Sequence, residues 1–298
     1  MLSFKRPTID DKTLIDSYLN RSALRICEYN FTNIFIWCDR YEQRFAEAGG
    51  FLFIRLGSGY LFPVGEGDLK NAFVEIENDA RAAGGAELRL VCLSKAQAEE
   101  TERLFPGRFA IEPVRDSFDY LYPIGDLCEL SGKKYQQKRN HIHRFEENNP
   151  DWRAEPVTPE NVALCLEMAE DWYAGHEEQG EDENVVAERA ALALAAANYA
   201  AMGLEGLLIR AEGRVLAFAI GCLSAGGCFD VVFEKAYGEI QGAFAIINRE
   251  FANLIRERHP EVLFVNREDD MGLEGLRKAK ESYHPIFEEK YMATLSLQ

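Results

Sequence analysis

The sequence predicts an α/β (α+β) protein with two domains, each a mixed sheet flanked by helices. At 298 residues the chain approaches the practical size limit of a single hydrophobic core. Its hydrophobic content of 47% is sufficient for real cores, and helical and strand patterns alternate along the whole length. We expect an N-terminal domain at residues 1–125 and a C-terminal domain at residues 126–298.

The N-terminal half shows the less regular order of elements. Gly57 and Gly59 predict a hairpin turn, and Gly84 and Gly85 predict the end of a helix. The helical segments lie at residues 10–19, 26–41, 68–82 and 95–104. Strands are expected at residues 51–56, 60–64, 88–93, 109–114 and 117–122, the last of these completing the first sheet.

The C-terminal half has the clearer pattern. Thr158 is a suitable N-cap, with Pro159 at the first helical position. Helices are expected at residues 159–173, 188–201, 242–258 and 273–282, and strands at 152–157, 207–210, 215–222, 228–233, 262–265 and 286–295. This order resembles the Gcn5-related N-acetyltransferase (GNAT, acyl-CoA N-acyltransferase) fold, and the N-terminal half fits a degenerate copy. We therefore expect two tandem GNAT-like domains.

Composition excludes several classes of protein. The net charge of −17 argues against an extended nucleic-acid surface, which needs a broad basic face. No apolar run approaches the roughly 20 residues that span a bilayer, and no signal peptide is evident, so we expect a cytoplasmic protein with no transmembrane segment. The seven cysteines form no CxxC pair, which predicts free thiols and no metal site.

A basic segment stands out in this acidic chain. Residues 133–144 contain no carboxylate, and we expect a helix at residues 132–146 that opens the C-terminal domain. Its charges either bind a phosphate or carboxylate ligand or offset acids of the protein itself, and both readings stay open. The candidate substrate-binding residues in this segment are Lys133, Lys134, Lys138, Arg139 and Asn140.

Polar residues also follow the predicted strand at 262–265. Ligands gather at the carboxyl ends of strands in open α/β sheets. We expect substrate-binding roles for Asn266, Arg267, Arg277 and Lys280. The candidate bases are Glu268 and Asp269, and the candidate acids are Tyr283 and His284.

A third candidate segment joins the strand at 228–233 to the long helix that follows. Glu234 is a further candidate base, and Lys235 a further substrate-binding residue. Gln241, Gly242 and Ala243 are what remains of a diphosphate-binding loop at a helix N-terminus, and are the candidate cofactor-binding residues. The acidic tract at residues 177–183 predicts a solvated loop, or one that lines the acceptor site.

Three strings together resemble a known family. They are residues 28–33 (EYNFTN), 132–142 (GKKYQQKRNHI) and 266–280 (NREDDMGLEGLRKAK). They are similar to stand-alone bacterial proteins of the phosphatidylglycerol lysyltransferase C-terminal-domain family. The resemblance implies tandem GNAT-like domains related to the Fem-type aminoacyltransferases.

We predict a transferase that moves an acyl or aminoacyl group to an amine or hydroxyl. Its co-substrate would be acyl-CoA or aminoacyl-tRNA, with no further cofactor. The expected partner is an anionic small molecule, a lipid headgroup or a tRNA acceptor end. The alternative is a non-catalytic module that binds an anionic small molecule or lipid on the same scaffold.

Overall fold

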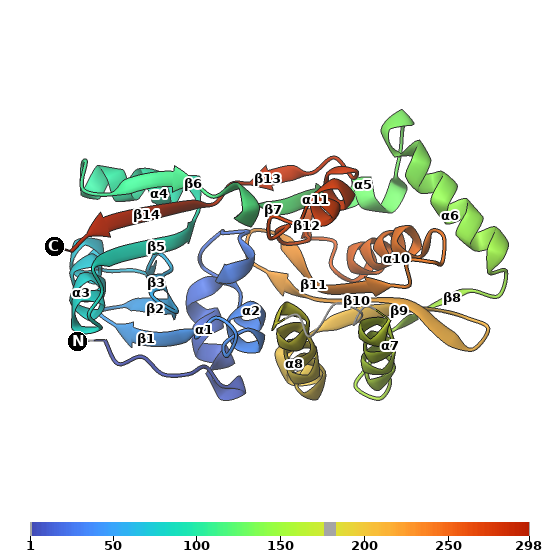
Figure 1. Cartoon of the computed structure of the whole chain (residues 1–298), viewed down its shortest axis with the longest axis horizontal. Coiled ribbons are helices and arrows are strands. Elements are labelled where there is room, and N and C mark those ends of the chain that lie inside the picture. The colour runs from blue at the N-terminus through green and yellow to red at the C-terminus, as the bar shows by residue number, and fades with distance from the viewer. Residues whose placement is uncertain (1, 176–182, 298) are drawn as a thin grey trace. The chain divides into compact units, whose positions relative to one another are not determined.

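The computed structural model describes residues 2–175 and 183–297 (Figure 1). The acidic tract singled out above therefore lies almost wholly outside the described residues. Two compact units are present. Unit 1 comprises Met1–Tyr120, Glu268–Lys278 and Phe287–Gln298, and unit 2 comprises Leu121–Arg267 and Ala279–Ile286. The division into domains at residues 1–125 and 126–298 stays a prediction.

Unit 1 contains a mixed sheet in the order β1-β2-β3-β5-β14-β6, with β4 paired to β2. Aromatic and aliphatic side chains such as Phe73, Ile76 and Leu90 form its core. The strands are β1 (Arg44–Ala48), β2 (Phe51–Leu56), β3 (Gly59–Tyr60), β4 (Val64–Gly65), β5 (Glu87–Leu93), β6 (Ala110–Pro113) and β14 (Tyr291–Ser296). The helices are α1 (Lys12–Leu19), α2 (Phe31–Ile36), α3 (Leu69–Ala82) and α4 (Lys95–Leu104), with short 3-10 turns at Ile9–Asp11, Cys27–Tyr29 and Arg115–Ser117.

The second sheet has the order β13-β7-β12-β11-β10-β9-β8. Its strands are β7 (Asp119–Pro123), β8 (Arg153–Pro156), β9 (Glu205–Ala211), β10 (Arg214–Ser224), β11 (Cys228–Ala236), β12 (Phe264–Asn266) and β13 (Ile286–Glu288). The helices are α5 (Ile124–Glu129), α6 (Gln136–Asn148), α7 (Ala163–Ala174), α8 (Glu183–Ala197), α9 (Tyr199–Met202), α10 (Ala243–Arg258) and α11 (Glu274–Glu281), with a 3-10 turn at Lys133–Tyr135. In Figure 1, α10 lies on one face of β9–β11, and α7 and α8 lie on the other.

Two strands join a different sheet from the one expected. The segment predicted to complete the first sheet forms β7, which pairs antiparallel with β12 in the second sheet. Leu121 and Tyr122 are fully buried, as expected of a strand with neighbours on both sides. The last strand, β14, pairs with β5 and β6 of unit 1. Local sequence does not encode pairings between segments so far apart along the chain.

The helix predicted at residues 26–41 is much shorter. The α2 helix covers only Phe31–Ile36, because Asn30 has extended backbone geometry and caps it. The Asn30 side chain accepts a hydrogen bond from the backbone N–H of Asn33 at 2.8 Å. Asparagine is one of the residues that most favour this position.

A β-bulge changes which side chains of β11 face α10. Ile220 pairs with Phe233, whereas the next residue, Gly221, pairs with Val231, so Val232 is the extra residue. A β-carbon on Gly221 would overlap the backbone carbonyl of Asp230, so only glycine fits opposite the bulge. The bulge reverses the alternation of side chains along the last part of β11.

No helix in the described part of the chain is both long and apolar enough to cross a lipid bilayer.

Candidate functional site

The second sheet opens at the carboxyl ends of its central parallel strands. The β11–β12 ladder ends at the Asp230–Asn266 pair, while β11 continues to Ala236. Ligand sites of open α/β sheets form where neighbouring parallel strands separate in this way.

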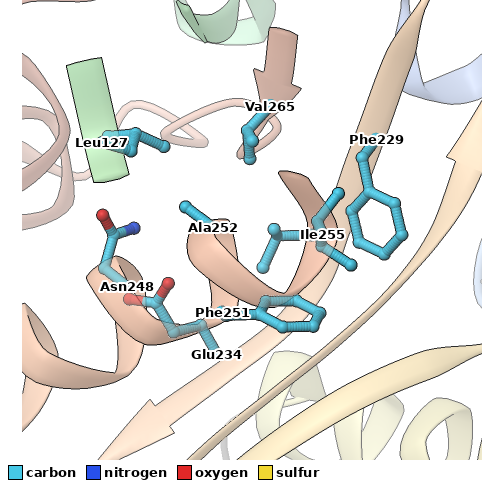
Figure 2. A pocket seen from close by; sticks show the side chains of 9 residues that line it. Leu127, Phe229, Glu234, Asn248, Phe251, Ala252, Ile255 and Val265 are labelled. Atoms are coloured by element: carbon cyan, nitrogen blue, oxygen red, sulfur yellow. The ribbon is translucent and has the colours of Figure 1, made fainter. Parts of the chain in front are cut away.

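A pocket lies at this opening, between α5, α10, β11 and β12 (Figure 2). Most of its wall is apolar, and its polar members are Glu234 and Asn248. The full lining is Leu127, Phe229, Val231, Glu234, Asn248, Phe251, Ala252, Ile255 and Val265. Figure 2 shows the polar ends of Glu234 and Asn248 on one side of the pocket, and Phe229 and Ile255 on the other.

Glu234 reaches this pocket because of the bulge in β11. Residues five apart on a regular strand point to opposite faces, yet Phe229 and Glu234 line the same pocket. The extra residue at Val232 accounts for this.

Asn248 lies on the buried face of α10 and is 5% exposed. Within the described residues its Oδ1 atom is buried without a hydrogen-bond partner. A buried carbonyl oxygen without a partner costs stability, so it indicates a position that a ligand can satisfy.

Glu234 forms a largely buried ion pair with Arg267, which follows β12. Arg267 Nη2 lies 2.7 Å from Glu234 Oε1, and the two side chains are 13% and 11% exposed. The guanidinium carbon lies 5.8 Å from the ring centre of Tyr122 and 5.3 Å from that of Tyr283. Its second terminal nitrogen, Nη1, is buried and finds no hydrogen-bond acceptor among the described residues. Arg267 thus keeps one buried donor available.

Lys138 of α6 approaches the same tyrosine. Its Nζ lies 3.8 Å from the ring centre of Tyr283 and donates to Ser282 Oγ at 2.6 Å. Burial, followed by the nearby charge of Arg267, lowers the pKa of Lys138 to about 8. The structure therefore brings together Lys138, Glu234, Arg267 and Tyr283 of the predicted site.

Lys280 and Asn266 are buried residues close to Arg267. Lys280 is buried, and its Nζ donates to the backbone carbonyl of Arg267 at 2.5 Å. The Tyr122 hydroxyl in turn donates to the backbone carbonyl of Lys280 at 2.8 Å. Asn266 is fully buried inside the sheet. The Lys280 ammonium therefore helps to hold the segment that carries Arg267.

The rest of the basic segment has mixed partners. Lys134 pairs with Asp126 at 3.1 Å, and Arg139 donates to the backbone carbonyls of Leu130 and Gly132 at the end of α5. Both residues therefore bind protein groups, but only Lys134 has the acidic partner that the counter-charge reading expects. Lys133 and Asn140 are exposed.

His284 is also exposed, and a ring nitrogen lies 3.4 Å from the backbone carbonyl of Lys134. This carbonyl can accept only from a protonated ring nitrogen, so the contact occupies one of the two nitrogens.

Lys235 points away from Glu234. It lies on the opposite face of β11, where its ammonium pairs with Glu188 at 3.0 Å and sits 3.9 Å from the ring centre of Trp172. Burial lowers its pKa, and Glu188 opposes that shift. Because successive side chains of a strand point to opposite faces of the sheet, Lys235 does not reach the pocket.

The predicted cofactor loop is occupied by protein atoms. Gly242 has a φ of +88°, and a β-carbon there would overlap the backbone carbonyl of His141 in α6. The N–H of Ala243 donates to the Ile240 carbonyl at 3.1 Å, and Ala243 is itself buried. Gln241 is exposed. One amide at the start of α10 is thus committed to a turn, and α6 packs against the glycine.

The other two candidate bases belong to unit 1. Glu268 Oε1 accepts from Asn33 Nδ2 at 2.9 Å, and the same amide nitrogen also contacts the Cys27 carbonyl at 2.9 Å. Asp269 accepts from the backbone N–H of Met271 at 3.2 Å. The Glu268–Asn33 contact links two of the distinctive strings, EYNFTN and NRED.

Arg277 belongs to a charged cluster in unit 1. It donates to the fully buried carboxylate of Asp270 at 2.9 Å and to Asp116 at 2.7 Å. Asp270 also accepts from the Tyr120 hydroxyl and from the Gly272 N–H. Sequence reasoning did not single out Asp270, which is the central acceptor of this cluster.

One group in unit 1 has the composition of a metal site. The ligand atoms of Cys27, Glu28 and Asp119 lie within 4.8 Å of one another. The buried ammonium of Lys290 stands 2.6 Å from Glu28 and 2.8 Å from Asp119. Burial raises the pKa of the Cys27 thiol well above its usual value. A neutral thiol and an ammonium beside both carboxylates do not suit a metal ion.

Asn248 was missed by sequence reasoning. The available signal was a single amide among the apolar residues on one face of α10, such as Ile247 and Phe251. Nothing local showed that this face would border an open end of the sheet.

Comparison with known proteins identifies the family. The family model described as phosphatidylglycerol lysyltransferase, C-terminal, matches residues 20–294. The chain belongs to this family. No curated protein matches the sequence. The predicted family is therefore confirmed, and membership places the chain among aminoacyl- and acyltransferases.

Solved structures agree with this assignment. A conserved protein of unknown function from Bacteroides thetaiotaomicron is 37% identical, with a TM-score of 0.92 over 99% of this chain and 100% of the other. The structure of L-PGS from Bacillus licheniformis is 16% identical, with a TM-score of 0.57 over 84% and 83%. FemX is 10% identical, with a TM-score of 0.58 over 98% and 97%. The predicted fold of two tandem GNAT-like domains is confirmed.

Proposed function

We propose that the chain is an aminoacyltransferase that moves the aminoacyl group of an aminoacyl-tRNA to an amine or hydroxyl acceptor. The pocket at the opening between β11 and β12 has room for about one water-sized group, so it receives only the ammonium end of the aminoacyl group. The observation that carries this proposal is that the Glu234 carboxylate and the unpartnered amide oxygen of Asn248 line the same, mostly apolar pocket.

Arg267 holds Glu234 Oε1, so the acceptors left for a ligand are the second oxygen of Glu234 and Asn248 Oδ1, and both favour a ligand that donates hydrogen bonds. A carboxylate and an amide oxygen both accept hydrogen bonds, and an ammonium group supplies three donors. An aminoacyl group carries an α-ammonium next to its reactive carbonyl, whereas an acetyl group has none.

The packing at Gly242 favours aminoacyl-tRNA over acyl-CoA. A diphosphate bound at a helix N-terminus needs open space and free backbone N–H groups. Here α6 packs against Gly242, and the N–H of Ala243 donates within a turn. Exposed Lys133 and Asn140 on the basic segment are the residues that we assign to the anionic acceptor end of the tRNA.

The reaction requires an attack on the ester carbonyl of the donor. Negative charge develops on the carbonyl oxygen when the acceptor nitrogen or oxygen forms its bond. We assign the stabilisation of this charge to Arg267, whose Nη1 is a buried donor not engaged by Glu234. The ester bond to the tRNA ribose then breaks, and the aminoacyl group stays on the acceptor.

The test is a radiolabelled transfer assay. Lysyl-tRNA and a mixture of other aminoacyl-tRNAs would be offered with phosphatidylglycerol micelles and with a panel of amines, beside acetyl-CoA in parallel reactions. We expect transfer from aminoacyl-tRNA that is lost in Asn248→Leu and retained in Asn253→Leu, a control on the same helix outside the pocket lining. Transfer from acetyl-CoA alone, or no transfer from any aminoacyl-tRNA, would overturn the proposal.

A second candidate is a module that binds an anionic small molecule or lipid without catalysis. It is favoured by the two cationic side chains, Lys138 and Arg267, that contact the Tyr283 ring. A thermal-shift screen separates the two functions. Stabilisation by phosphorylated metabolites or anionic lipid that weakens with salt, with no transfer, would favour binding alone.

A further inference from the structure

We propose that Lys138 is the catalytic base of this site. In its neutral form it takes the proton from the attacking amine or hydroxyl and passes it to the departing ribose oxygen. This assignment rests on the proposed function and replaces the anion-binding role that the sequence predicted for Lys138.

The first argument is the position of the side chain. Lys138 is half-buried on α6, and its Nζ stands over the ring of Tyr283 at 3.8 Å. The guanidinium of Arg267 contacts the same ring, with its carbon 5.3 Å from the ring centre. Lys138, the proposed base, and Arg267, the proposed oxyanion donor, thus both contact the ring of Tyr283.

The second argument comes from hydrogen bonding at Nζ. The Ser282 hydroxyl donates to the Ala279 carbonyl at 2.5 Å, so its oxygen accepts from Lys138 at 2.6 Å. A neutral lysine amine has two N–H donors and one lone pair. One donor is used by Ser282 and the other can face the Tyr283 ring. The lone pair is consumed by neither neighbour and can receive a proton.

The third argument is the charge environment. Among residues 2–175 and 183–297, no carboxylate lies within ion-pair distance of Lys138. Arg267 repels a second positive charge, and the acid that acts on Lys138, Glu234, is already paired with Arg267. Burial raises the pKa of the Tyr283 hydroxyl, which stays neutral. By contrast, the hydrogen bond to Asp126 raises the pKa of Lys134, four residues earlier on the basic segment.

The earlier candidates fit this role less well. The Glu234 carboxylate is held by Arg267 at 2.7 Å, and a proton on it would break that ion pair. His284 is exposed, with one ring nitrogen against the Lys134 carbonyl. A pKa of about 8 also places Lys138 close to neutral pH, where general bases are most effective.

The proton transfers balance without another reactant. The acceptor N–H or O–H gives its proton to Nζ of Lys138 as the new bond to the carbonyl carbon forms. The ester C–O bond breaks, and the resulting Lys138 ammonium returns that proton to the ribose oxygen. Lys138 ends the cycle as it began, a neutral amine.

The test compares Lys138→Arg with the wild type in single-turnover transfer from lysyl-tRNA to phosphatidylglycerol micelles between pH 6 and 9. Arginine keeps the positive charge and the ring contact but does not deprotonate. We expect the wild-type rate to rise with pH and level off above about 8. The variant should lose about 10²- to 10⁴-fold in rate and show no such rise, with donor affinity nearly unchanged. Lys95→Met, at an exposed lysine of unit 1, is the control.

The possible outcomes separate a failure of the Lys138 assignment from a failure of the proposed function. A Lys138→Arg variant with the wild-type rate and pH profile refutes the base, as does a loss confined to KM, which indicates anion binding. Absence of transfer by the wild type contradicts the proposed function instead. An NMR titration of the Lys138 side chain tests the premise of this inference separately, because a midpoint near pH 8 shows an amine that can act as a base, whereas one above about pH 10 refutes the inference.

Discussion

Replacing Lys290 with methionine is expected to destabilise unit 1 severely. Lys290 is fully buried, and its ammonium lies 2.6 Å from Glu28 and 2.8 Å from Asp119. With an effective dielectric constant of about 20, each contact has a Coulomb attraction of about 6 kcal/mol. Desolvation of the three charges offsets much of this sum. Removal of one partner from a buried ion pair typically costs about 3–5 kcal/mol, and we expect a loss of that size at pH 7.

The loss should depend on pH. Burial raises the pKa of Glu28, and attraction to Lys290 more than offsets it, so the pKa lies below its usual value. In the variant the attraction to Lys290 is lost, while burial still raises the pKa of Glu28 against the smaller effects of a backbone hydrogen bond and of Cys92, so Glu28 should take up a proton more readily. Protonation removes the unpaired charge, and the deficit in unfolding free energy should therefore shrink as the pH falls from 8 to 5.

Urea unfolding followed by circular dichroism at pH 8, 7 and 5 measures this effect. The Lys95→Met variant, at an exposed position, should stay within about 0.5 kcal/mol of the wild type at each pH. A loss below about 1 kcal/mol for Lys290→Met, or a loss of equal size at pH 5 and pH 8, would refute the electrostatic reasoning.

Two further predictions concern the fold around the candidate site. Gly242→Ala should lower the melting temperature or prevent folding, because the new β-carbon would overlap the His141 carbonyl and the residue has a positive φ. Gly238 has open space around it, so the control Gly238→Ala should leave the melting temperature nearly unchanged. Equal melting temperatures for the two variants would contradict the packing described for α6. Asp270→Asn should cost about 2–3 kcal/mol in urea unfolding at pH 7, because it weakens a fully buried acceptor of Arg277 and Tyr120. Burial opposes ionisation of Asp270, but its hydrogen bonds with Arg277 and Tyr120 hold the pKa well below its usual value, so its stabilisation should persist to pH 5 and fall away only in strong acid. If Asp270→Asn leaves the protein as stable as the wild type at pH 7, the cluster has no structural role.

Most element types could be predicted from sequence, because each depends on local patterns, although β1 and α5 were not expected. The strand–helix order from residue 152 onward matches the observed order from β8 to α11 except for the short additional helix α9. The partners of β7 and β14 could not be predicted in the same way. Both strands pair with segments distant in the chain, and hydrophobic patterns do not specify which sheet a strand joins.

The candidate site was predictable in part. Lys138, Glu234, Arg267 and Tyr283 were all expected to contribute, and the structure places them in one cluster. The prediction for the neighbouring residue Lys235 was wrong because of the local strand geometry. Lys235 adjoins Glu234 in sequence, yet the alternation of the strand sends it to the opposite face. No local pattern indicated the bulge at Val232, which decides that Glu234 and not Phe233 faces α10.

The basic segment illustrates the limits of charge counting. Three of its cations have different partners: Asp126 for Lys134, backbone carbonyls for Arg139, and an aromatic ring for Lys138. The charge pattern of the sequence cannot predict which partner each cation has, because the partner depends on which segments pack against α6. The counter-charge reading therefore holds for Lys134, whereas ligand binding by the exposed residues of the segment stays a prediction.

The central claim is that Glu234 and Asn248 recognise the ammonium group of an aminoacyl donor. The most direct measurement compares transfer from lysyl-tRNA with transfer from the same tRNA carrying α-N-acetyl-lysine, which lacks the α-ammonium. We predict that the wild type strongly prefers the unmodified donor and that Asn248→Leu and Glu234→Gln reduce this preference. Equal rates from the two donors in the wild type would contradict the account.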